Sequence, residues 1–307
     1  MYDVIIIGAG PAGLAAALYA GRYRMNILVL EKMCVGGQII LSSTIENFPG
    51  FPGGISTQEL IDKFKQQVDE LGTNIVIEDV LELGLNSKLK TPIYNIKTSD
   101  KSYEAKSVIV ACGAQSKRLG VKGEDRLTGH GVSYCATCDG PLFRDKDVVV
   151  VGGGDRALEE AIFLTSYARQ VSVIHRRQQL RASKILEEKA KQNTKINFIL
   201  DSVVEEIVGI NRVEAVKIKD IKTDSESNLP CQGVFIFVGI QPNTAFLNQL
   251  LQMDQSGFII TDQEMKTSRD GMFACGDCRR KGLYQVVNAC AEGAVAAHSA
   301  HKYLLSL

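Results

Sequence analysis

Two segments of the sequence repeat one local pattern, an apolar run that leads directly into a glycine-rich turn and a helix. The apolar runs span residues 4–7 and 148–151, and β-branched side chains fill both of them without polar alternation. Such runs are typical of parallel strands that are covered on both faces. A shift of 144 residues superposes the two turns, pairing Gly8 with Gly152, Gly10 with Gly154 and Gly13 with Ala157. The chain is therefore predicted to contain two strand–turn–helix units.

The spacing of these glycines is that of a dinucleotide-binding turn. The first glycine permits a tight turn, the second lets a pyrophosphate approach the backbone, and the third, or an alanine, allows the helix to pack closely on the strand. One such match could be an ordinary turn, but two matches that each follow a buried strand predict two nucleotide sites. The predicted binding residues are Gly8, Gly10, Pro11, Ala12 and Gly13 in the first turn, and Gly152, Gly154, Asp155, Arg156 and Ala157 in the second.

The order of the remaining patterns predicts how the two units are arranged. The length of 307 residues suits about two domains. Further strands are expected at 27–30, 107–111 and 233–238, and helices at 14–22, 57–71 and 285–305, with another after the second turn that ends near Arg169. The predicted fold is α/β, with two Rossmann-like dinucleotide-binding domains, the second inserted into the first. The first domain is expected to comprise 1–115 and 244–307 and the second 116–243, with joins near 114–118 and 239–244.

The residue expected beside the adenosine ribose differs between the two units. In the first unit the second strand ends at Glu31, whose carboxylate can accept hydrogen bonds from ribose hydroxyls, as expected for FAD or NAD. The equivalent position in the second unit is His175, followed by Arg176, Arg177 and Arg181. Guanidinium groups can hold a 2′-phosphate that a carboxylate would repel. The second site is thus expected to prefer NADPH, although a solvated basic stretch is the alternative interpretation.

Two cysteines separated by two residues are the candidate redox centre. Cys135 and Cys138 can close a small-loop disulfide, and this spacing lowers the pKa of one thiol. The next residue, Asp139, could carry protons to and from a leaving thiolate if burial raises its pKa, or it could simply serve the Asp-Gly turn. Zinc is the competing interpretation, because Cys275 and Cys278 have the same spacing, although the two pairs lie far apart in sequence.

Four further cysteines have no second cysteine at this spacing. The isolated cysteines are expected to be small buried apolar residues: Cys34, Cys112, Cys231 and Cys290.

Equal numbers of basic and acidic residues, 35 each, argue against binding to nucleic acid or an anionic membrane. The longest uncharged run is shorter than the ~20 residues of a membrane span. We therefore expect a cytoplasmic protein whose cysteines serve redox or metal chemistry.

Over essentially its whole length the chain resembles the low-molecular-weight, bacterial-type thioredoxin reductases. The resemblance is carried by residues 133–140 (SYCATCDG), by 152–161 (GGGDRALEEA), and by the basic residues His175-Arg176-Arg177 and Arg181. Two flavin-side loops, 36–38 (GGQ) and 46–50 (ENFPG), also match, as does 271–277 (GMFACGD). The resemblance implies FAD in the first domain, NADPH in the second, a homodimer, and thioredoxin as the protein substrate.

The resemblance also assigns roles to individual residues. It implies that Cys138 faces the flavin, that Cys135 attacks the partner disulfide, and that Asp139 is the acid–base. It places Gln38, Asn47, Gln285 and Val286 near the flavin ring, and Asp277 on the ribityl chain. The FAD-binding residues that it implies beyond the glycine turn are Glu31, Lys32, Gly36, Gly37, Gln38, Asn47, Ala111, Gly113, Gly276, Asp277, Tyr284, Gln285 and Val286.

Three positions depart from the family pattern. Cys112 stands where a threonine is usual, Tyr284 where an arginine often precedes the glutamine, and Arg156 where a small residue is common. Some relatives exchange electrons with ferredoxin or lack the cysteine pair, and the basic cluster and Cys135/Cys138 argue against both. The expected route runs from NADPH through FAD to the cysteine pair, with rotation of one domain about the joins. A peroxiredoxin or glutaredoxin-like substrate is the alternative.

Overall fold

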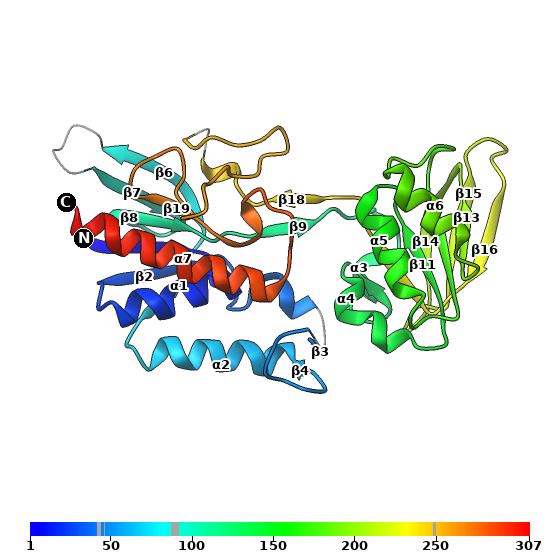
Figure 1. Cartoon of the computed structure of the whole chain (residues 1–307), viewed down its shortest axis with the longest axis horizontal. Coiled ribbons are helices and arrows are strands. Elements are labelled where there is room, and N and C mark those ends of the chain that lie inside the picture. The colour runs from blue at the N-terminus through cyan, green and yellow to red at the C-terminus, as the bar shows by residue number, and fades with distance from the viewer. Residues whose placement is uncertain (42–43, 46, 87–91, 248–249) are drawn as a thin grey trace.

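The computed structural model describes residues 1–41, 44–45, 47–86, 92–247 and 250–307. The described chain forms two lobes that lie end to end (Figure 1). Two paired antiparallel strands, β9 (Ala114–Ser116) and β18 (Ile240–Pro242), run between them. Both chain ends lie at the far end of the first lobe, so the second lobe is built from the middle of the sequence. The two strands of this ribbon fall within the ranges 114–118 and 239–244.

The first lobe is built on a seven-stranded sheet. Its parallel part has the order β5-β2-β1-β8, with β19 also paired to β8, and an antiparallel hairpin of β7 and β6 extends it. A separate two-stranded sheet joins β3 to β4. The strands of this lobe are β1 (Tyr2–Ile7), β2 (Ile27–Glu31), β3 (Thr44–Ile45), β4 (Ile55–Ser56), β5 (Asn74–Ile77), β6 (Val80–Asn86), β7 (Ile93–Thr98), β8 (Ser102–Val110) and β19 (Met272–Ala274).

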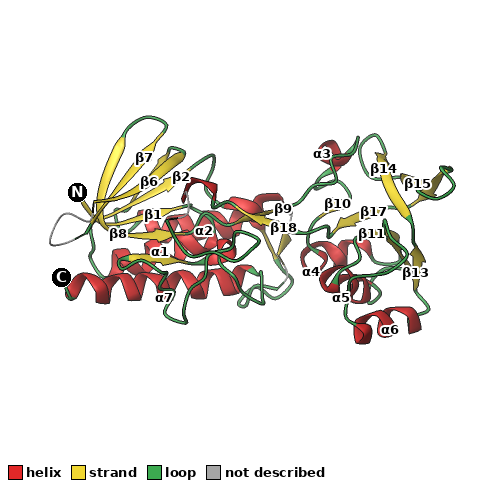
Figure 2. Ribbon diagram, turned by 90° about the horizontal axis from the view of Figure 1, so that it is seen from above, coloured by secondary structure: helices red, strands yellow, loops and turns green. Residues whose placement is uncertain are grey.

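The α-helices in the described part of the first lobe are α1 (Pro11–Arg22), α2 (Thr57–Asp69) and α7 (Val286–Leu305). The helices α1 and α7 run side by side in both ribbon views (Figures 1 and 2). Their facing sides are rich in alanine, so the two helices pack closely against each other and against the sheet. This packing brings the C-terminal helix onto the first glycine turn.

The second lobe contains a five-stranded parallel sheet of order β10-β17-β11-β12-β13 and a three-stranded antiparallel sheet of β14, β15 and β16. The strands are β10 (Val132–Ser133), β11 (Asp147–Val151), β12 (Gln170–Ile174), β13 (Ile196–Ile199), β14 (Ser202–Val208), β15 (Ala215–Asp220), β16 (Glu226–Pro230) and β17 (Gly233–Ile236). The helices are α3 (Glu124–Leu127), α4 (Ala136–Asp139), α5 (Asp155–Leu164) and α6 (Lys184–Gln192).

The lack of polar alternation in the two apolar runs follows from burial on both faces. In β1, Val4 and Ile6 pack with α1 and α7, whereas Ile5 and Ile7 pack on the opposite face with the β6–β7 hairpin. In β11 the alternate valines likewise divide between the α5 side and the side of the antiparallel sheet. Each fully buried aliphatic side chain of this kind contributes about 1.5–3 kcal/mol.

The predicted fold class is confirmed, because the molecule is α/β with two Rossmann-type units. Most element boundaries differ from the prediction by a few residues, as expected for helix and strand ends. The clearest error is the helix after the second turn, which ends at Leu164 rather than near Arg169. There the Thr165 hydroxyl donates to the carbonyl of Ile162 at 2.6 Å, and the following amides bond three residues back, which ends the α-helix.

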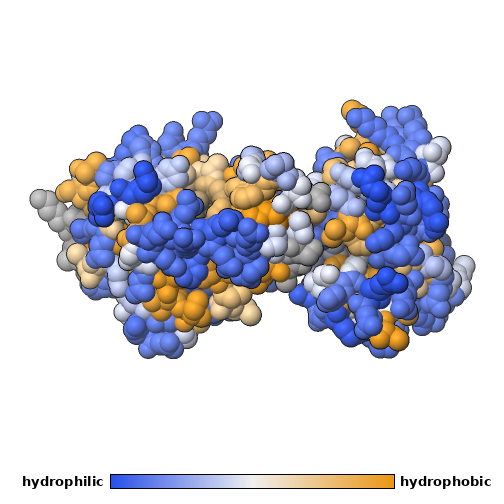
Figure 3. All heavy atoms as spheres, turned by 90° about the horizontal axis from the view of Figure 1, so that it is seen from below, coloured by the Kyte–Doolittle hydropathy of each residue, from blue (hydrophilic) through white to orange (hydrophobic). Residues whose placement is uncertain are grey.

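No helix in the described ranges is long and apolar enough to cross a bilayer. Figure 3 shows one face of the molecule, on which hydrophilic side chains cover most of the second lobe. Apolar side chains emerge on this face mainly as separate patches on the first lobe.

We expect Gly13→Ala to destabilise the protein severely. A Cβ atom at this position would lie 1.8 Å from the carbonyl oxygen of Gly8, where backbone rather than a movable side chain blocks it. Relieving such a clash costs at least ~2 kcal/mol. Gly154→Ala is the matched control, because a Cβ there meets nothing within 4 Å. Urea unfolding of the two variants measures the difference, and equal midpoints would contradict the packing argument.

Candidate active site

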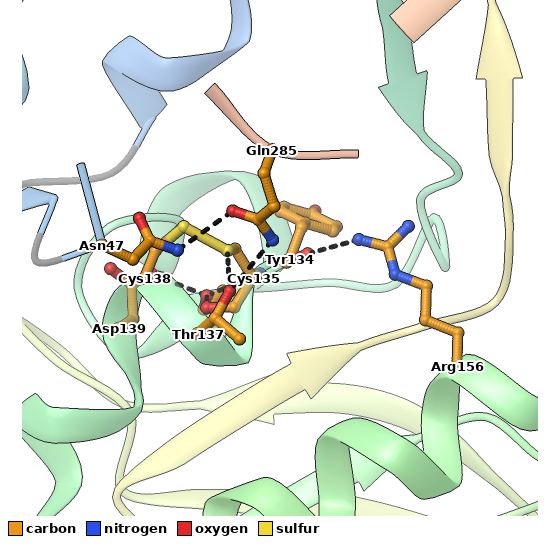
Figure 4. Close-up of a disulfide and its surroundings, with 9 residues drawn as sticks. Asn47, Tyr134, Cys135, Thr137, Cys138, Asp139, Arg156 and Gln285 are labelled. Carbon is orange, nitrogen blue, oxygen red and sulfur yellow. Dashed lines mark hydrogen bonds between the residues drawn. A yellow bond between two sulfur atoms is a disulfide. The ribbon is translucent and has the colours of Figure 1, made fainter. Parts of the chain in front are cut away.

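The cysteine pair lies at the edge of the second lobe that faces the first. The edge strand β10 leads into Cys135, and Cys138 lies on the short helix α4. The two form a disulfide with their Cα atoms 5.3 Å apart. Figure 4 shows this disulfide with Asn47 and Gln285, which belong to the first lobe, beside it. The predicted redox pair is thus assembled at the junction of the two lobes.

The carboxyl group of Asp139 is buried beside the disulfide. Burial raises its pKa, although the hydroxyl of Ser133, which donates to Oδ2 at 2.6 Å, partly offsets this effect. The same hydroxyl oxygen accepts the backbone N–H of Cys135 at 3.1 Å. A small pocket opens next to the carboxyl, lined by Gly129, Gly131, Val132, Ser133, Asp139, Leu142 and Phe143. The environment of Asp139 is the one that proton transfer needs, because the carboxyl is buried, hydrogen-bonded and adjacent to a pocket.

Side chains of the first lobe reach the cysteine pair through hydrogen bonds. The Gln285 amide donates through Nε2 to the hydroxyl of Thr137 at 3.2 Å. Asn47 donates through Nδ2 to Oε1 of Gln285 at 3.1 Å. Asn47 and Gln285, which were both expected near a flavin ring, therefore lie together and next to the disulfide (Figure 4).

The first glycine turn has the shape that a pyrophosphate requires. Gly8 has a φ of +107°, and a Cβ there would lie 2.4 Å from the carbonyl oxygen of Ala111. At Gly10, by contrast, a Cβ would meet only backbone atoms of Gly36 and Gly37 at 3.9 Å, so this side of the turn is open. Glu31 accepts the backbone N–H of Ala9 at 2.7 Å, which places its carboxylate at the end of the turn. These residues fit a dinucleotide.

A cluster of charged side chains, centred on the buried carboxylate of Glu292, holds the loop that follows β19. Glu292 on α7 accepts the N–H of Gly276 at 2.8 Å and pairs with Arg279 at 2.7 Å. Lys281 bridges Glu292 at 3.4 Å and Asp277 at 2.7 Å. Asp277, expected on the ribityl chain, therefore has one carboxylate oxygen paired with an internal lysine. The cluster fixes this loop against α7.

The other residues that the resemblance assigned to FAD surround the first turn and the flavin-side loops. Lys32 pairs with Asp79 at 2.9 Å. Tyr284 packs against Phe258 at 6.0 Å between ring centroids, and Lys281 lies 5.4 Å from the Tyr284 ring centre. Pro11 begins α1, and Ala12 and Ala111 lie in the hydrophobic cluster around that helix. The N–H of Gly36 donates to the carbonyl of Ala9, and Gly37 begins the 3-10 helix that contains Gln38. The carbonyl of Gly113 accepts the N–H of Asn243, and Val286 packs against the hydrophobic cluster that contains Ile45. Glu46, within the second expected loop, lies outside the described residues.

In the second glycine turn the backbone is also open at the expected phosphate position. A Cβ at Gly154 would meet nothing within 4 Å, whereas one at Gly152 would lie 2.8 Å from the Cβ of Ala157. Asp155 accepts the backbone N–H of Ser183 at 2.6 Å and so ties the turn to the segment after β12. Arg156 points away from this segment, donating to the carbonyl of Tyr134 at 3.4 Å (Figure 4).

The basic residues after β12 surround the far end of the second turn. His175 is buried against Gly153, and its Nε2 has no hydrogen-bond partner among the described residues. Burial lowers the pKa of His175, and the nearby arginines lower it further. Arg176, Arg177 and Arg181 are exposed, and none of them pairs with a carboxylate in the part of the chain that the structure describes. Three exposed guanidinium groups without a carboxylate partner among the described residues fit a bound phosphate.

The remaining cysteines correct part of the sequence interpretation. Cys34 is exposed on the loop after β2, and Cys112 and Cys290 are half-buried, so only Cys231 of the four is fully buried as expected. Cys34 differs because it lies beyond the end of the buried strand. Cys275 and Cys278 are buried in the first lobe, where Cys278 Sγ donates to the carbonyl of Cys275 at 3.2 Å. With Cys135 bonded to Cys138, the structure does not form the four-cysteine cluster of the zinc interpretation.

Sequence reasoning missed several residues that complete the site. Ser133 holds Asp139, Thr137 contacts Gln285, and Lys281 with Glu292 holds the loop of Asp277. Ser133 and Thr137 belong to the segment that carries the resemblance, which was the available signal. Lys281 and Glu292 lie in no recognised motif, and only their burial reveals them.

Comparison with known proteins gives one consistent result. A family model described as pyridine nucleotide-disulphide oxidoreductase matches residues 2–293. The chain is 45% identical to a thioredoxin reductase of Peptoclostridium litorale, over all of this chain and 98% of that protein. The crystal structure of thioredoxin reductase from Streptococcus pyogenes is 45% identical, with a TM-score of 0.92, covering 100% of this chain and 99% of that one. The crystal structure of Lactococcus lactis thioredoxin reductase in the FR conformation is 40% identical with a TM-score of 0.71, and both chains are fully covered.

We expect Asp139→Asn to change how folding stability depends on pH. Burial raises the pKa of the folded-state carboxyl, so the unfolded chain releases this proton at a lower pH, near its usual ~4. Below that pH the carboxyl costs the fold nothing; the cost grows as the pH rises from there to the folded-state pKa and is constant at higher pH. The asparagine variant should therefore gain stability relative to the native protein over this interval, as measured by urea unfolding at a series of pH values.

Asp147→Asn provides a control of opposite sign. Its hydrogen bonds with Arg169 lower the pKa of Asp147, so this carboxylate stabilises the fold above its unfolded-state pKa and loses that effect in acid. The Asp147 variant should be less stable than the native protein near neutrality and should approach it as the pH falls. Parallel pH curves for all three proteins would contradict the assignment.

Proposed function

Because this chain belongs to the pyridine nucleotide-disulphide oxidoreductases and, among them, to the thioredoxin reductases, we propose that it reduces the disulfide of oxidised thioredoxin with electrons from NADPH. It is a flavoprotein disulfide reductase that uses a nicotinamide nucleotide. The observation that carries the proposal is the Cys135–Cys138 disulfide, which lies beside the buried carboxyl of Asp139 and next to Asn47 and Gln285 of the other lobe.

We assign FAD to the first lobe and NADPH to the second. The open face of Gly10, the carboxylate of Glu31 and the loop held by Glu292 would hold FAD. The open face of Gly154 and the basic residues after β12 would hold NADPH. When bound, a flavin carries two electrons from a reduced nicotinamide to a disulfide. The domain limits predicted from the sequence, 1–115 with 244–307 and 116–243, are proposed on the same basis.

Cys135 and Cys138 have different chemical roles in the proposed reaction. Two electrons and two protons convert the disulfide into the thiols of Cys135 and Cys138. The Cys135 thiolate then attacks the thioredoxin disulfide, forming a mixed disulfide and releasing one thioredoxin thiolate. The Cys138 thiolate attacks Cys135 Sγ, releases the second thioredoxin thiolate and restores the pair. Asp139 exchanges protons with these sulfurs, which its raised pKa permits.

We further propose that the lobes rotate about β9 and β18 during this cycle. The pair lies against the first lobe here, whereas a protein substrate must reach Cys135 from outside. Two solved relatives of similar identity, 45% and 40%, differ in TM-score from this chain, 0.92 against 0.71, although both are covered at 99% or more. A change in lobe arrangement accounts for such a difference more simply than a change of fold within either lobe. The hinges would lie at 114–118 and 239–244.

The cellular setting is proposed on chemical grounds. Six of the eight cysteines are unpaired among the described residues, which suits a reducing compartment such as the cytoplasm. A homodimer is proposed from the family resemblance. Thioredoxin is preferred over a peroxiredoxin or glutaredoxin-like substrate because the similar proteins bear the name thioredoxin reductase.

Cys138→Ser tests the electron route directly. The variant should still allow NADPH to bleach the flavin absorbance, because neither nucleotide site includes this residue, but it should lose thioredoxin reduction completely. Both steps are followed by absorbance in the same protein preparation. Cys34→Ser, which alters an exposed cysteine outside the pair, should keep both activities. Loss of flavin reduction together with thioredoxin reduction in the Cys138 variant would contradict the route.

The basic cluster predicts nucleotide preference. Replacing both Arg176 and Arg177 by alanine should raise the KM for NADPH by about tenfold or more, since a charge-assisted hydrogen bond to phosphate contributes ~1.5–3 kcal/mol. The KM for NADH should change little, because NADH lacks the 2′-phosphate. Steady-state kinetics with the two nucleotides measure this, with Arg144→Ala as an exposed arginine outside the loop. A rise that is equal for NADH and NADPH would exclude a 2′-phosphate site here.

A further inference from the structure

A row of three polar side chains connects the first lobe to one sulfur of the disulfide. Asn47 donates to Gln285 at 3.1 Å, Gln285 donates to the hydroxyl of Thr137 at 3.2 Å, and that hydroxyl lies 3.4 Å from Sγ of Cys135 (Figure 4). Asn47 and Gln285 belong to the first lobe, while Thr137 and Cys135 belong to the second. The row therefore crosses the junction of the lobes and ends at a reacting atom.

The donor and the acceptor of each hydrogen bond in this row follow from the chemistry of the side chains. Sγ of Cys135 carries no hydrogen because it is bonded to Cys138, so the Thr137 hydroxyl must be the donor in that contact. Its oxygen is then free to accept the N–H of Gln285. Asn47 binds the carbonyl oxygen of the Gln285 amide, which turns the amide nitrogen towards Thr137. All three bonds thus orient the hydroxyl proton towards sulfur.

We propose that Thr137 is a positioning residue whose hydroxyl, oriented by Gln285 of the opposite lobe, stabilises the thiolate of Cys135 once the pair is reduced. A hydrogen bond to a charged acceptor is stronger than one to a neutral acceptor, so the contact favours the thiolate over the thiol and over the disulfide sulfur. The donation from Gln285 polarises the hydroxyl and strengthens its own donation.

Two consequences follow for the reaction, and they rest on the proposed function. Thr137 stabilises the thiolate of Cys135, the sulfur that attacks thioredoxin. Because both residues belong to the second lobe, Thr137 moves together with Cys135 when the lobes rearrange. The support from Gln285 exists only in the present arrangement of the lobes, so separation of the lobes would weaken the hydrogen bond and make the thiolate more nucleophilic. Thr137 would in this way connect lobe position to thiol reactivity.

Other ionisable groups around the pair must be held constant in any test. Cys138 and Asp139 lie on the same short helix, and Tyr134 precedes it. Arg156 on α5 binds the Tyr134 carbonyl, and Tyr284 is the ionisable residue next to Gln285 from the first lobe. Substitution of Thr137 leaves Asp139, Tyr134, Arg156 and Tyr284 in place, position 138 is the same in every variant compared, and threonine itself has no charge to lose.

The experiment measures the acidity of the Cys135 thiol without any turnover. In a Cys138→Ser background, holoprotein is reduced with dithiothreitol, freed of reductant, and alkylated with iodoacetamide at a series of pH values. Mass spectrometry of the peptide that contains Cys135 gives the rate, which rises with the thiolate fraction. The Thr137→Val, Thr137→Ala and Thr137→Ser variants are compared in this background, and bound flavin absorbance and circular dichroism check that each is folded.

The valine and alanine variants should shift the inflection of the rate profile upwards by about one pH unit, and the serine variant should restore it. Gln285→Leu should give a smaller upward shift, because the hydroxyl keeps its proton but loses its orientation. An unshifted profile in both hydroxyl-free variants would overturn the proposal, as would a serine variant that behaves like alanine. Since no thioredoxin and no NADPH enter the assay, failure here is distinguishable from failure of the proposed function.

Discussion

Close approach of backbone to backbone at the first glycine turn is the constraint on which the first lobe depends. The helix α1 can begin directly at the end of β1 only because residue 13 has no Cβ to meet the Gly8 carbonyl. The C-terminal helix α7 then packs along α1 through small side chains, and its Glu292 holds the loop after β19. One steric condition near the N-terminus therefore positions residues more than two hundred positions later in the sequence.

The site exists because two separately built lobes meet. Each lobe covers both faces of its own parallel sheet, and neither requires the other for its core. Asp139 belongs to the second lobe and accepts the hydroxyl of Ser133 from the same lobe. The hydrogen bonds from Asn47 and Gln285, in contrast, depend on how the lobes are placed. Access to the sulfurs therefore depends on the junction.

Much of the site was predictable because it is encoded in short contiguous motifs. Gly8, Gly154 and the Cys135–Cys138 pair were each predicted from the spacing of neighbouring residues, and the structure places the glycines in strand–helix turns and joins the cysteines in a disulfide. The prediction that Cys34 is buried was wrong, because burial depends on the path of the loop, which the local sequence does not specify. The helix α5 ended early because a threonine side chain competes with the backbone, and propensity alone does not weigh such competition.

The sequence by itself determined two Rossmann-type units, the redox pair, the carboxyl beside it and the basic cluster after β12. These depend on residue type and on spacing within one segment, where backbone geometry is nearly settled by local sterics. Only the tertiary structure decided that Lys281 neutralises Asp277 and that Glu292 anchors its loop. Only it decided that Gln285 lies on Thr137. Such contacts join residues far apart in the chain, and they arise from packing that local patterns do not record.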